Sequence, residues 1–230
     1  LKLKVMKLQN SQYRLRIIIG ILGMLLPILI YVNHMDLLSS ISHYYYTSSS
    51  VFFIGILFSF GLVLIAYRGY PIDPDSNEKY SDDWITTLAG IFIIVTVVIP
   101  TSCKDSLGDL QFCAEGYLFG HGNKTRGIIH LISAGAFLFF LGLMCYGKFT
   151  MGKSLSLKKK RLYKICGILI WICIGLLIVL FVLEWILNKD FNSYLPGYTF
   201  YLETLAVWAF GIAWLVKGKA HHWRRASFSS

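Results

Sequence analysis

The amino-acid sequence alternates six long apolar runs with short polar segments, and this pattern predicts the architecture. Each run is close to the about 20 residues that cross roughly 30 Å of hydrocarbon as a helix. Backbone amides in that layer have no water to bind, so a helix is the expected structure of each run. The pattern therefore predicts an all-α, polytopic integral membrane protein: a single domain that forms a six-transmembrane-helix bundle. The predicted spans are 17–32, 46–67, 84–100, 127–146, 165–187 and 198–216.

Positive charges are distributed unevenly among the segments that join these spans. The chain has 22 Lys and Arg residues and a net charge of +10. Eighteen of the 22 lie before the first span or after the second, fourth and sixth spans, which places them on one side. Cytoplasmic segments carry an excess of Lys and Arg, so both termini are predicted to be cytoplasmic, in the plasma (inner) membrane. Because these residues flank spans, we expect the partners to be membrane lipids and not nucleic acid.

The most polar segment close to the spans is Asp36–Thr47, DLLSSISHYYYT, between the first two runs. It contains an acid, a histidine, three serines, a threonine and three tyrosines, and no Lys or Arg. With cytoplasmic termini it is extracytoplasmic. We expect Ser39, Ser42 and Tyr45 to bind a substrate there. The simpler explanation of the three consecutive tyrosines is an aromatic belt at the membrane interface.

Ionisable residues inside the runs gather at one predicted depth. His130 and Glu203 lie within about two turns of the outer ends of their spans, beneath Asp36 and His43. A charged side chain within a span costs about 2.5–3.5 kcal/mol on insertion scales, which makes each such residue a functional hypothesis. We predict that Glu203 and His130 form the centre of a catalytic site, which His43 and Asp36 close from above. Ser133, one turn after His130, is a further candidate for substrate binding.

Structural explanations exist for the same residues. Glu184 lies one turn from the outer end of its span, where it either binds substrate or extends to the lipid headgroups. Glu203 lies deeper and is harder to explain in this way. His130 is equally compatible with a packed, hydrogen-bonded histidine. The sequence leaves these alternatives open.

The longest predicted extracytoplasmic segment, Thr101–Arg126, contains Cys103 and Cys113, the two cysteines outside the runs. Extracytoplasmic compartments are usually oxidising, which favours a Cys103–Cys113 disulfide. A metal pair is the alternative, although the spacing resembles no common ligand motif. Asn123 begins a glycosylation sequon that matters only in a eukaryotic host.

Three stretches together resemble the Frag/DRAM/Sfk-type six-helix membrane proteins and their uncharacterised bacterial relatives. They are SISHYYYT leading into the second run, YRGY at its end, and ETLAVWAFGIAWLVKG in the last run. The six-span layout with both ends inside is similar as well. This resemblance implies a lipid-associated role and carries no established enzyme mechanism.

A shorter resemblance involves Ser39-x-x-x-His43, which is similar to the SxxxH pattern of the CREST superfamily of membrane hydrolases, alkaline ceramidases included. In that family the histidine helps to hold zinc, and an HxxxH pair on a late helix completes the site. This sequence has no HxxxH and six predicted spans instead of seven. A divalent metal such as zinc would therefore need His43, His130 and Glu203 as its ligands.

The leading functional hypothesis is a membrane protein that handles a lipid or other amphiphile at a polar site near the outer leaflet. If it is an enzyme, it is a headgroup hydrolase or transferase with Glu203 or His130 as the general base. One alternative is a transporter or channel subunit, although the inner halves of the spans are almost wholly apolar. Another is a non-catalytic membrane anchor or assembly partner, in an oligomer or with another protein. The chain has no Walker lysine, GxSxG, HExxH or CxxC motif.

Overall fold

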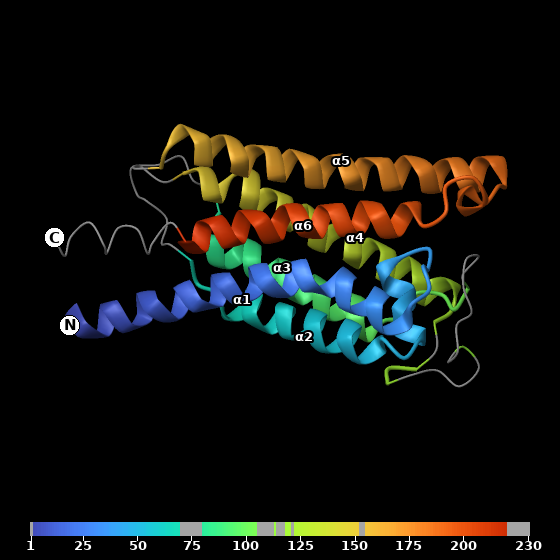
Figure 1. The fold of residues 1–230 in the computed structure, drawn as a ribbon, viewed down its shortest axis with the longest axis horizontal. Helices are drawn as coiled ribbons and strands as arrows, with labels where there is room; N and C mark the ends of the chain where they lie inside the picture. The colour runs from blue at the N-terminus through green and yellow to red at the C-terminus, as the bar shows by residue number, and fades with distance from the viewer. Residues whose placement is uncertain are drawn as a thin grey trace.

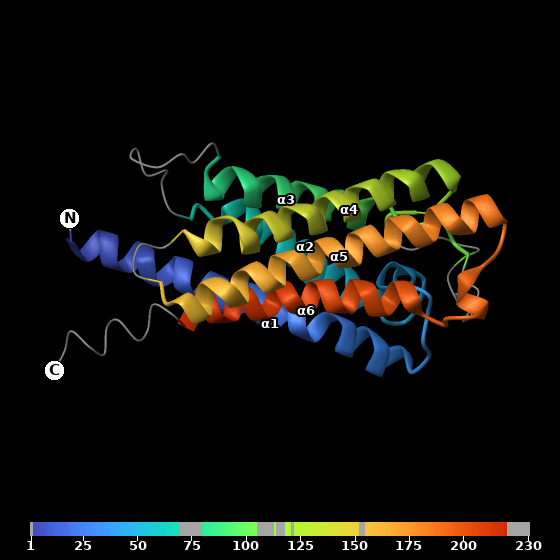
Figure 2. The same ribbon diagram turned by 90° about the horizontal axis from the view of Figure 1, so that it is seen from above.

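Helix accounts for 79% of the structure, and no strand occurs among the described residues, as the apolar runs predict. The computed structural model describes residues 2–69, 80–104, 113, 118–120, 122–151 and 155–219, and only the backbone of residues 2–13 and 219. Figures 1 and 2 show the long helices lying side by side in an elongated bundle. The long helices are α1 (Lys2–His34), α2 (Ser50–Ala66), α3 (Asp82–Val98), α4 (Lys124–Tyr146), α5 (Leu157–Leu187) and α6 (Tyr198–Lys219). Three short 3₁₀ helices lie between them: η1 (Ile41–Tyr46), η2 (Lys148–Thr150) and η3 (Phe191–Ser193).

Among the described residues, four helical segments are long and apolar enough to cross a membrane, which indicates a multi-pass membrane protein. They are Arg14–His34, Lys124–Thr150, Leu157–Leu187 and Tyr198–Gly218. The helix α2 is apolar but shorter, with 17 residues. The helix α3 has the same length and begins with two acids, Asp82 and Asp83. The count of six crossings thus depends on these two shorter helices.

Two helices extend well beyond the apolar runs that predicted them. The helix α1 begins at Lys2, and α5 begins at Leu157 and includes the basic sequence LKKKRLYK, which was expected to belong to a connecting loop. Lys and Arg are good helix formers. On α5, their long side chains allow the charge to stay in water while the helix continues past the apolar run. The basic segments therefore lengthen the helices.

The helices form a closed ring in which each packs along the next one in sequence, and α1 packs along α6. The crossing of α2 and α3 is close because two glycines face each other there. A Cβ atom at Gly61 would lie 3.0 Å from the carbonyl oxygen of Gly90. Small residues of this kind allow helix backbones to approach within a membrane.

The interior of the ring is filled by aromatic side chains. Phe60 of α2 lies edge-on to Phe137 of α4, with ring centroids 5.8 Å apart, and 5.7 Å from Phe210 of α6. The outside is also apolar, most clearly on α5. Its exposed residues include Ile165, Ile168, Ile172, Leu176, Ile178 and Val179. An apolar exterior over an equally apolar core is what a lipid solvent requires.

The two ends of the bundle are distinguished by the segments that lie there. The helix α1 begins and α6 ends at one end, here called the termini end, and η1 lies at the opposite end, here called the η1 end (Figure 1). His121 and the basic residues after 219 lie outside the described residues. The described bond between Cys103 and Cys113, whose Cα atoms are 5.6 Å apart, confirms the predicted disulfide.

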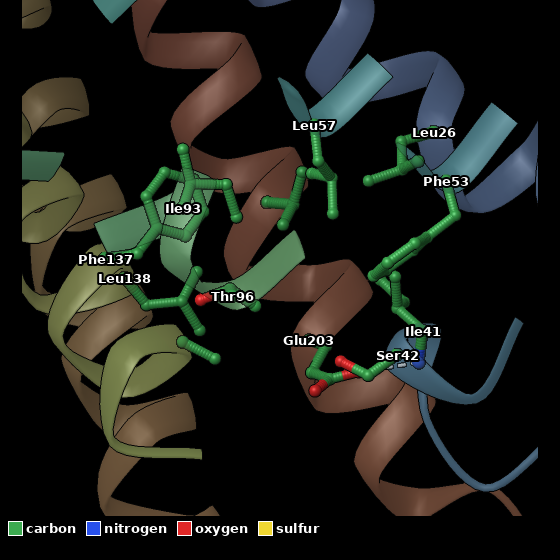
Figure 3. Close-up of a pocket in the computed structure, with 12 residues that line it drawn as sticks. Leu26, Ile41, Ser42, Phe53, Leu57, Ile93, Thr96, Phe137, Leu138 and Glu203 are labelled. Carbon is green, nitrogen blue, oxygen red and sulfur yellow. Dashed lines mark hydrogen bonds between the residues drawn. The ribbon is translucent and has the colours of Figure 1, made fainter. Parts of the chain in front are cut away.

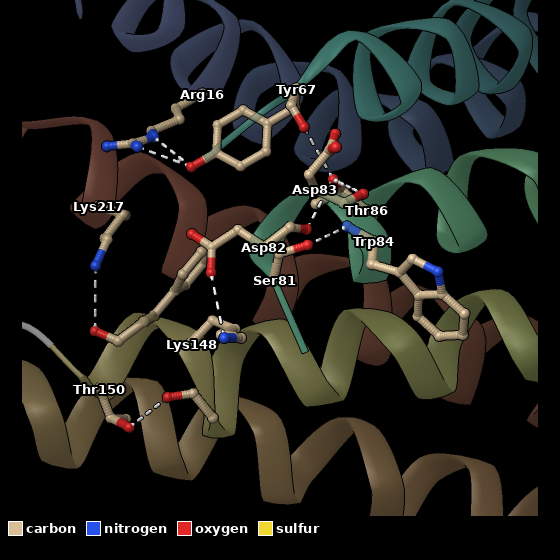
Figure 4. A network of polar contacts seen from close by, with 12 residues as sticks. Arg16, Tyr67, Ser81, Asp82, Asp83, Trp84, Thr86, Lys148, Thr150 and Lys217 are labelled. Carbon is tan, nitrogen blue, oxygen red and sulfur yellow. Dashed lines mark hydrogen bonds and ion pairs between the residues drawn. The ribbon is translucent and has the colours of Figure 1, made fainter. Parts of the chain in front are cut away.

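Buried polar contacts link helices at the termini end (Figure 4). The Arg16 guanidinium on α1 donates from Nε and Nη2 to the Tyr67 hydroxyl, at 3.0 and 2.7 Å. Lys148 Nζ lies 3.8 Å from Asp82 Oδ1, and both side chains are largely buried. Lys217 on α6 donates to the Phe149 carbonyl at 3.3 Å. Arg16, Asp82, Lys148 and Lys217 lie just outside the predicted spans, so the expectation of almost wholly apolar inner halves stays a prediction.

Candidate functional site

The η1 segment is held in place by hydrogen bonds to both neighbouring helices. The Ile41 amide donates to Glu203 Oε2 on α6 at 2.7 Å. The Phe200 amide, in the first turn of α6, donates to the Ser39 carbonyl at 2.9 Å. Where the segment leads into α2, the Ser49 hydroxyl donates to the Ile30 carbonyl of α1 at 2.7 Å. The polar segment singled out in the sequence is therefore folded into the end of the ring.

The three tyrosines of η1 are buried, so the expected interfacial belt is wrong. Tyr46 donates to the Thr101 carbonyl at 2.6 Å and accepts from the Gly122 amide at 2.8 Å. Tyr45 does the same between the Gly120 carbonyl, at 3.2 Å, and the Phe119 amide, at 2.8 Å. A tyrosine hydroxyl can donate and accept at once, which suits it to satisfy loop backbone. Tyr45 was predicted to bind substrate, and its hydroxyl is engaged with the protein instead.

Ser42 and His130 form a hydrogen-bonded pair beneath these tyrosines. Ser42 Oγ lies 2.8 Å from His130 Nε2, and His130 Nδ1 lies 2.8 Å from the Ile99 carbonyl oxygen. A carbonyl oxygen can only accept, so Nδ1 carries the proton of this contact. In the neutral ring Nε2 is then an acceptor, and the Ser42 hydroxyl donates to it. His130 is 4% exposed, which holds this arrangement in a fixed orientation.

The end of α3 explains why the Ile99 carbonyl is available. The last carbonyls of a helix have no partner within it. Ile99 is the C-cap of α3, and the residue that follows is Pro100, which has no amide hydrogen. The His130 ring satisfies one of these carbonyls. Its position also fixes which ring nitrogen faces Ser42.

His43 makes a second serine–histidine contact on the same segment. Its Nδ1 lies 2.9 Å from Ser39 Oγ and 3.0 Å from Ser40 Oγ. His43 is partly exposed, whereas both serines are buried. The predicted grouping of His43 with Ser39 is therefore present.

A cavity of about 50 Å³ lies between Ser42 and the centre of the bundle. Figure 3 shows the Ser42 hydroxyl and the Glu203 carboxyl at one end of it, with apolar side chains around the rest. Thr96 is the third polar residue of the lining. The apolar lining consists of Leu26, Ile41, Phe53, Leu57, Ile93, Ala134, Phe137, Leu138 and Val207. This arrangement suits a ligand with one polar and one apolar part.

Glu203 contributes one oxygen to the fold and leaves the other for a ligand. Oε2 accepts from the Ile41 amide. In the described part of the chain this is the single hydrogen bond of the Glu203 side chain. Since Glu203 lines the cavity, Oε1 is available to a polar group bound there.

Other predicted site residues do not meet at this cavity. Asp36 is exposed and contributes its backbone carbonyl, which accepts from Tyr44 at 2.9 Å. Glu184 Oε1 accepts from the Phe191 amide at 2.8 Å and so secures the turn before α6. Ser133 is buried on α4 but is not among the lining residues.

The predicted metal ligands do not form a metal site in the described structure. Among the described residues, no three His, Cys, Asp or Glu side chains lie close enough together to hold a metal ion. Each candidate has a different set of contacts. His130 bonds to Ser42 and Ile99, His43 to two serines, and Glu203 to Ile41. In each of these contacts the protein partner is a neutral hydroxyl or backbone group.

The comparisons with known proteins add no assignment to this geometry. No family model matches the chain, and no curated protein or solved structure matches it either. The chemistry is therefore argued from the site alone. A serine hydroxyl that donates to a histidine, which is oriented by a third group, is the arrangement of an activated nucleophile.

Proposed function

We propose that the chain crosses the membrane six times with both termini in the cytoplasm. The asymmetry of Lys and Arg supports this orientation. An even number of crossings is supported by α1 beginning and α6 ending at the same end (Figure 1). At 1.5 Å per residue, the 17-residue helices α2 and α3 are about 26 Å long, close to the hydrocarbon thickness. This orientation puts the η1 end at the outer leaflet.

The proposed function is the hydrolysis or transfer of an ester in the headgroup region of an amphiphile. The observation that carries it is the buried series of hydrogen bonds from Ser42 to His130 and from His130 to the Ile99 carbonyl. Ser42 and Glu203 both line the cavity. His130 serves as the general base, because Nε2 is the acceptor in the neutral ring. Glu203 Oε1 binds a hydroxyl of the amphiphile. The apolar lining accepts the part of the molecule that has no polar atoms.

The test uses the purified protein in phosphatidylcholine vesicles, incubated with monoacylglycerols from acetyl to dodecanoyl. Mass spectrometry then measures the acid released or the ester transferred. We expect turnover in the wild type, its loss in His130→Gln and a reduction in Glu203→Gln. Asp83→Asn is the control, because Asp83 is exposed on α3 at the other end. Wild-type vesicles that release no more acid and form no more transferred ester than protein-free vesicles would overturn the proposed function.

A transporter is the second candidate, favoured by the polar network at the termini end. Arg16 and Lys217 lie at the end opposite Glu203, so charged side chains occur at both ends of the ring. The aromatic side chains of Phe60, Phe137 and Phe210 lie between the two ends. Flux of a labelled amphiphile between the leaflets of the same vesicles distinguishes the candidates. Flux that persists in His130→Gln would favour transport.

A further inference from the structure

We propose that Ser42 is the nucleophile of this site and that it carries a short acyl group, of about two carbons, as a covalent intermediate. The inference rests on the proposed function and adds the reacting atom and the class of the transferred group. Its substrates are O-acetyl esters, and the acceptor is water or the hydroxyl of an amphiphile.

The first argument is the direction of the Ser42 hydrogen bond. The Ile99 carbonyl accepts from Nδ1 at 2.8 Å, so in the neutral ring Nε2 can take the Ser42 proton. The proton therefore has a defined destination when Ser42 Oγ attacks. In many enzymes a group that accepts a hydrogen bond from Nδ1 keeps the histidine tautomer whose Nε2 activates a serine.

The second argument is the size of the space beside Ser42. The cavity holds about 50 Å³. An apolar cavity of about 150 Å³ in another protein holds one benzene molecule, which has six carbons. A third of that volume holds roughly two carbon-sized groups by the same scale. An acetyl group on Ser42 Oγ matches this volume, whereas an eight-carbon chain exceeds it and would have to extend beyond it or displace Leu57, Phe137 and their neighbours.

The third argument is the placement of Glu203. Its carboxyl lies at the same end of the cavity as the Ser42 hydroxyl (Figure 3). Oε2 is bonded to the amide of Ile41, the residue before Ser42, which fixes the carboxyl relative to the nucleophile. Oε1 can then orient the hydroxyl of the leaving or accepting alcohol. Glu203 is in this account a positioning residue for the alcohol, and Ser42 and His130 move the proton.

The proposed steps conserve atoms and need no oxidant or reductant. Ser42 Oγ forms a bond to the acetyl carbonyl carbon while its proton moves to His130 Nε2. The bond from that carbon to the alcohol oxygen then breaks, and the alcohol leaves with the proton from Nε2. Water or an acceptor hydroxyl next attacks the acetyl carbon and gives its proton to Nε2. Ser42 leaves as an alkoxide that takes this proton back.

The experiment uses the full chain in detergent micelles with p-nitrophenyl acetate, followed by rapid acid quench and peptide mapping by mass spectrometry. We expect one acetyl group on Ser42 in the wild type and none there in His130→Gln. Ser50→Ala is the matched control: Ser50 is buried near the same end, and its hydroxyl has no hydrogen-bond partner in the described structure. It is expected to keep the Ser42 adduct. Because the wild-type peptide map is decisive alone, the test does not depend on how any variant folds.

Further outcomes separate this inference from the proposed function. We expect release from p-nitrophenyl acetate to exceed that from p-nitrophenyl octanoate at least tenfold, after each is corrected for its uncatalysed rate. Turnover that persists in Ser42→Ala but is lost in His130→Gln would overturn the nucleophile and leave the proposed function intact. Faster turnover of the octanoate would overturn the short acyl group alone. No adduct and no turnover of any ester by the wild type would overturn both proposals.

Discussion

The two ends of the bundle both contain buried polar side chains, but they use them differently. At the termini end, Arg16 bonds to Tyr67 and Lys148 to Asp82, so these groups connect the ends of helices to one another. At the η1 end, Ser42 and Glu203 also bond to the protein, and both line a cavity. The difference teaches that buried polarity by itself does not mark a reaction site. In the proposed account, polar atoms that also line a cavity do.

The sharpest way to test this comparison is to change the base at the η1 end. His130→Gln removes the proton acceptor and keeps a polar group of similar length. We expect ester turnover to fall by about 10²- to 10⁴-fold, the usual contribution of a positioned general base. The rate of p-nitrophenol release measures it, and the thermal unfolding midpoint in detergent is expected to change little. Full activity in a folded His130→Gln protein would remove the distinction between the two ends.

The second prediction breaks the ion pair at the termini end. Asp82→Asn keeps the shape of the side chain and leaves Lys148 buried without its acidic partner 3.8 Å away. Breaking a buried pair by removing one charge costs about 3–5 kcal/mol. We expect a clearly lower unfolding midpoint and unchanged turnover per folded molecule. The neighbouring Asp83→Asn, at an exposed position, is expected to show neither effect; equal destabilisation by the two variants would contradict the structural role of the pair.

The third prediction concerns the disulfide in the loop at the η1 end. Replacing Cys103 and Cys113 by Ser opens a loop of ten residues. The chain-entropy estimate for a loop of this length is about 2.7 kcal/mol of unfolding free energy. Chemical unfolding of the double variant and of the wild type measures the difference. The Cys173→Ser variant, which changes a free thiol, is the control; a larger loss in that variant would show that the disulfide is not the source of stability.

The smallest expected effect is at Tyr46. Tyr46→Phe removes one hydroxyl that accepts from the Gly122 amide and donates to the Thr101 carbonyl. Leaving buried backbone groups unsatisfied costs about 1–3 kcal/mol. We expect a lower unfolding midpoint, with ester turnover reduced less than in His130→Gln. Tyr201→Phe, on an exposed side chain, is expected to have the unfolding midpoint of the wild type. Equal midpoints for the two variants would contradict the structural role of the Tyr46 hydroxyl.

Much of the fold was predictable because apolar runs specify membrane-sized helices directly. The runs predicted all six long helices, although the basic starts of α1 and α5 were assigned to loops. The disulfide followed from the position of two cysteines outside the runs. Local composition was therefore enough to predict the helices and the disulfide, because both depend on nearby residues and on the solvent around them.

The site was only partly predictable because it depends on how η1 folds back into the ring. Glu203 and His130 were recognised as ionisable residues inside spans. The pairing of His130 with Ser42 joins residues 88 positions apart, and it requires the burial of three tyrosines that the sequence favoured as an interfacial belt. The Ile99 carbonyl could not be chosen from side-chain chemistry at all. Pro100, which ends α3, was the one available signal.

The protonation of His130 tests the central claim most directly, because the proposed chemistry requires Nε2 to accept the Ser42 proton. Nitrogen-15 NMR of histidine-labelled protein in lipid bilayers can measure it, with His130 assigned by subtracting the spectrum of His130→Gln. The account predicts a neutral ring with its hydrogen on Nδ1 and a bare Nε2 that accepts a hydrogen bond. A hydrogen on Nε2 would make His130 a donor to Ser42 and would contradict the account.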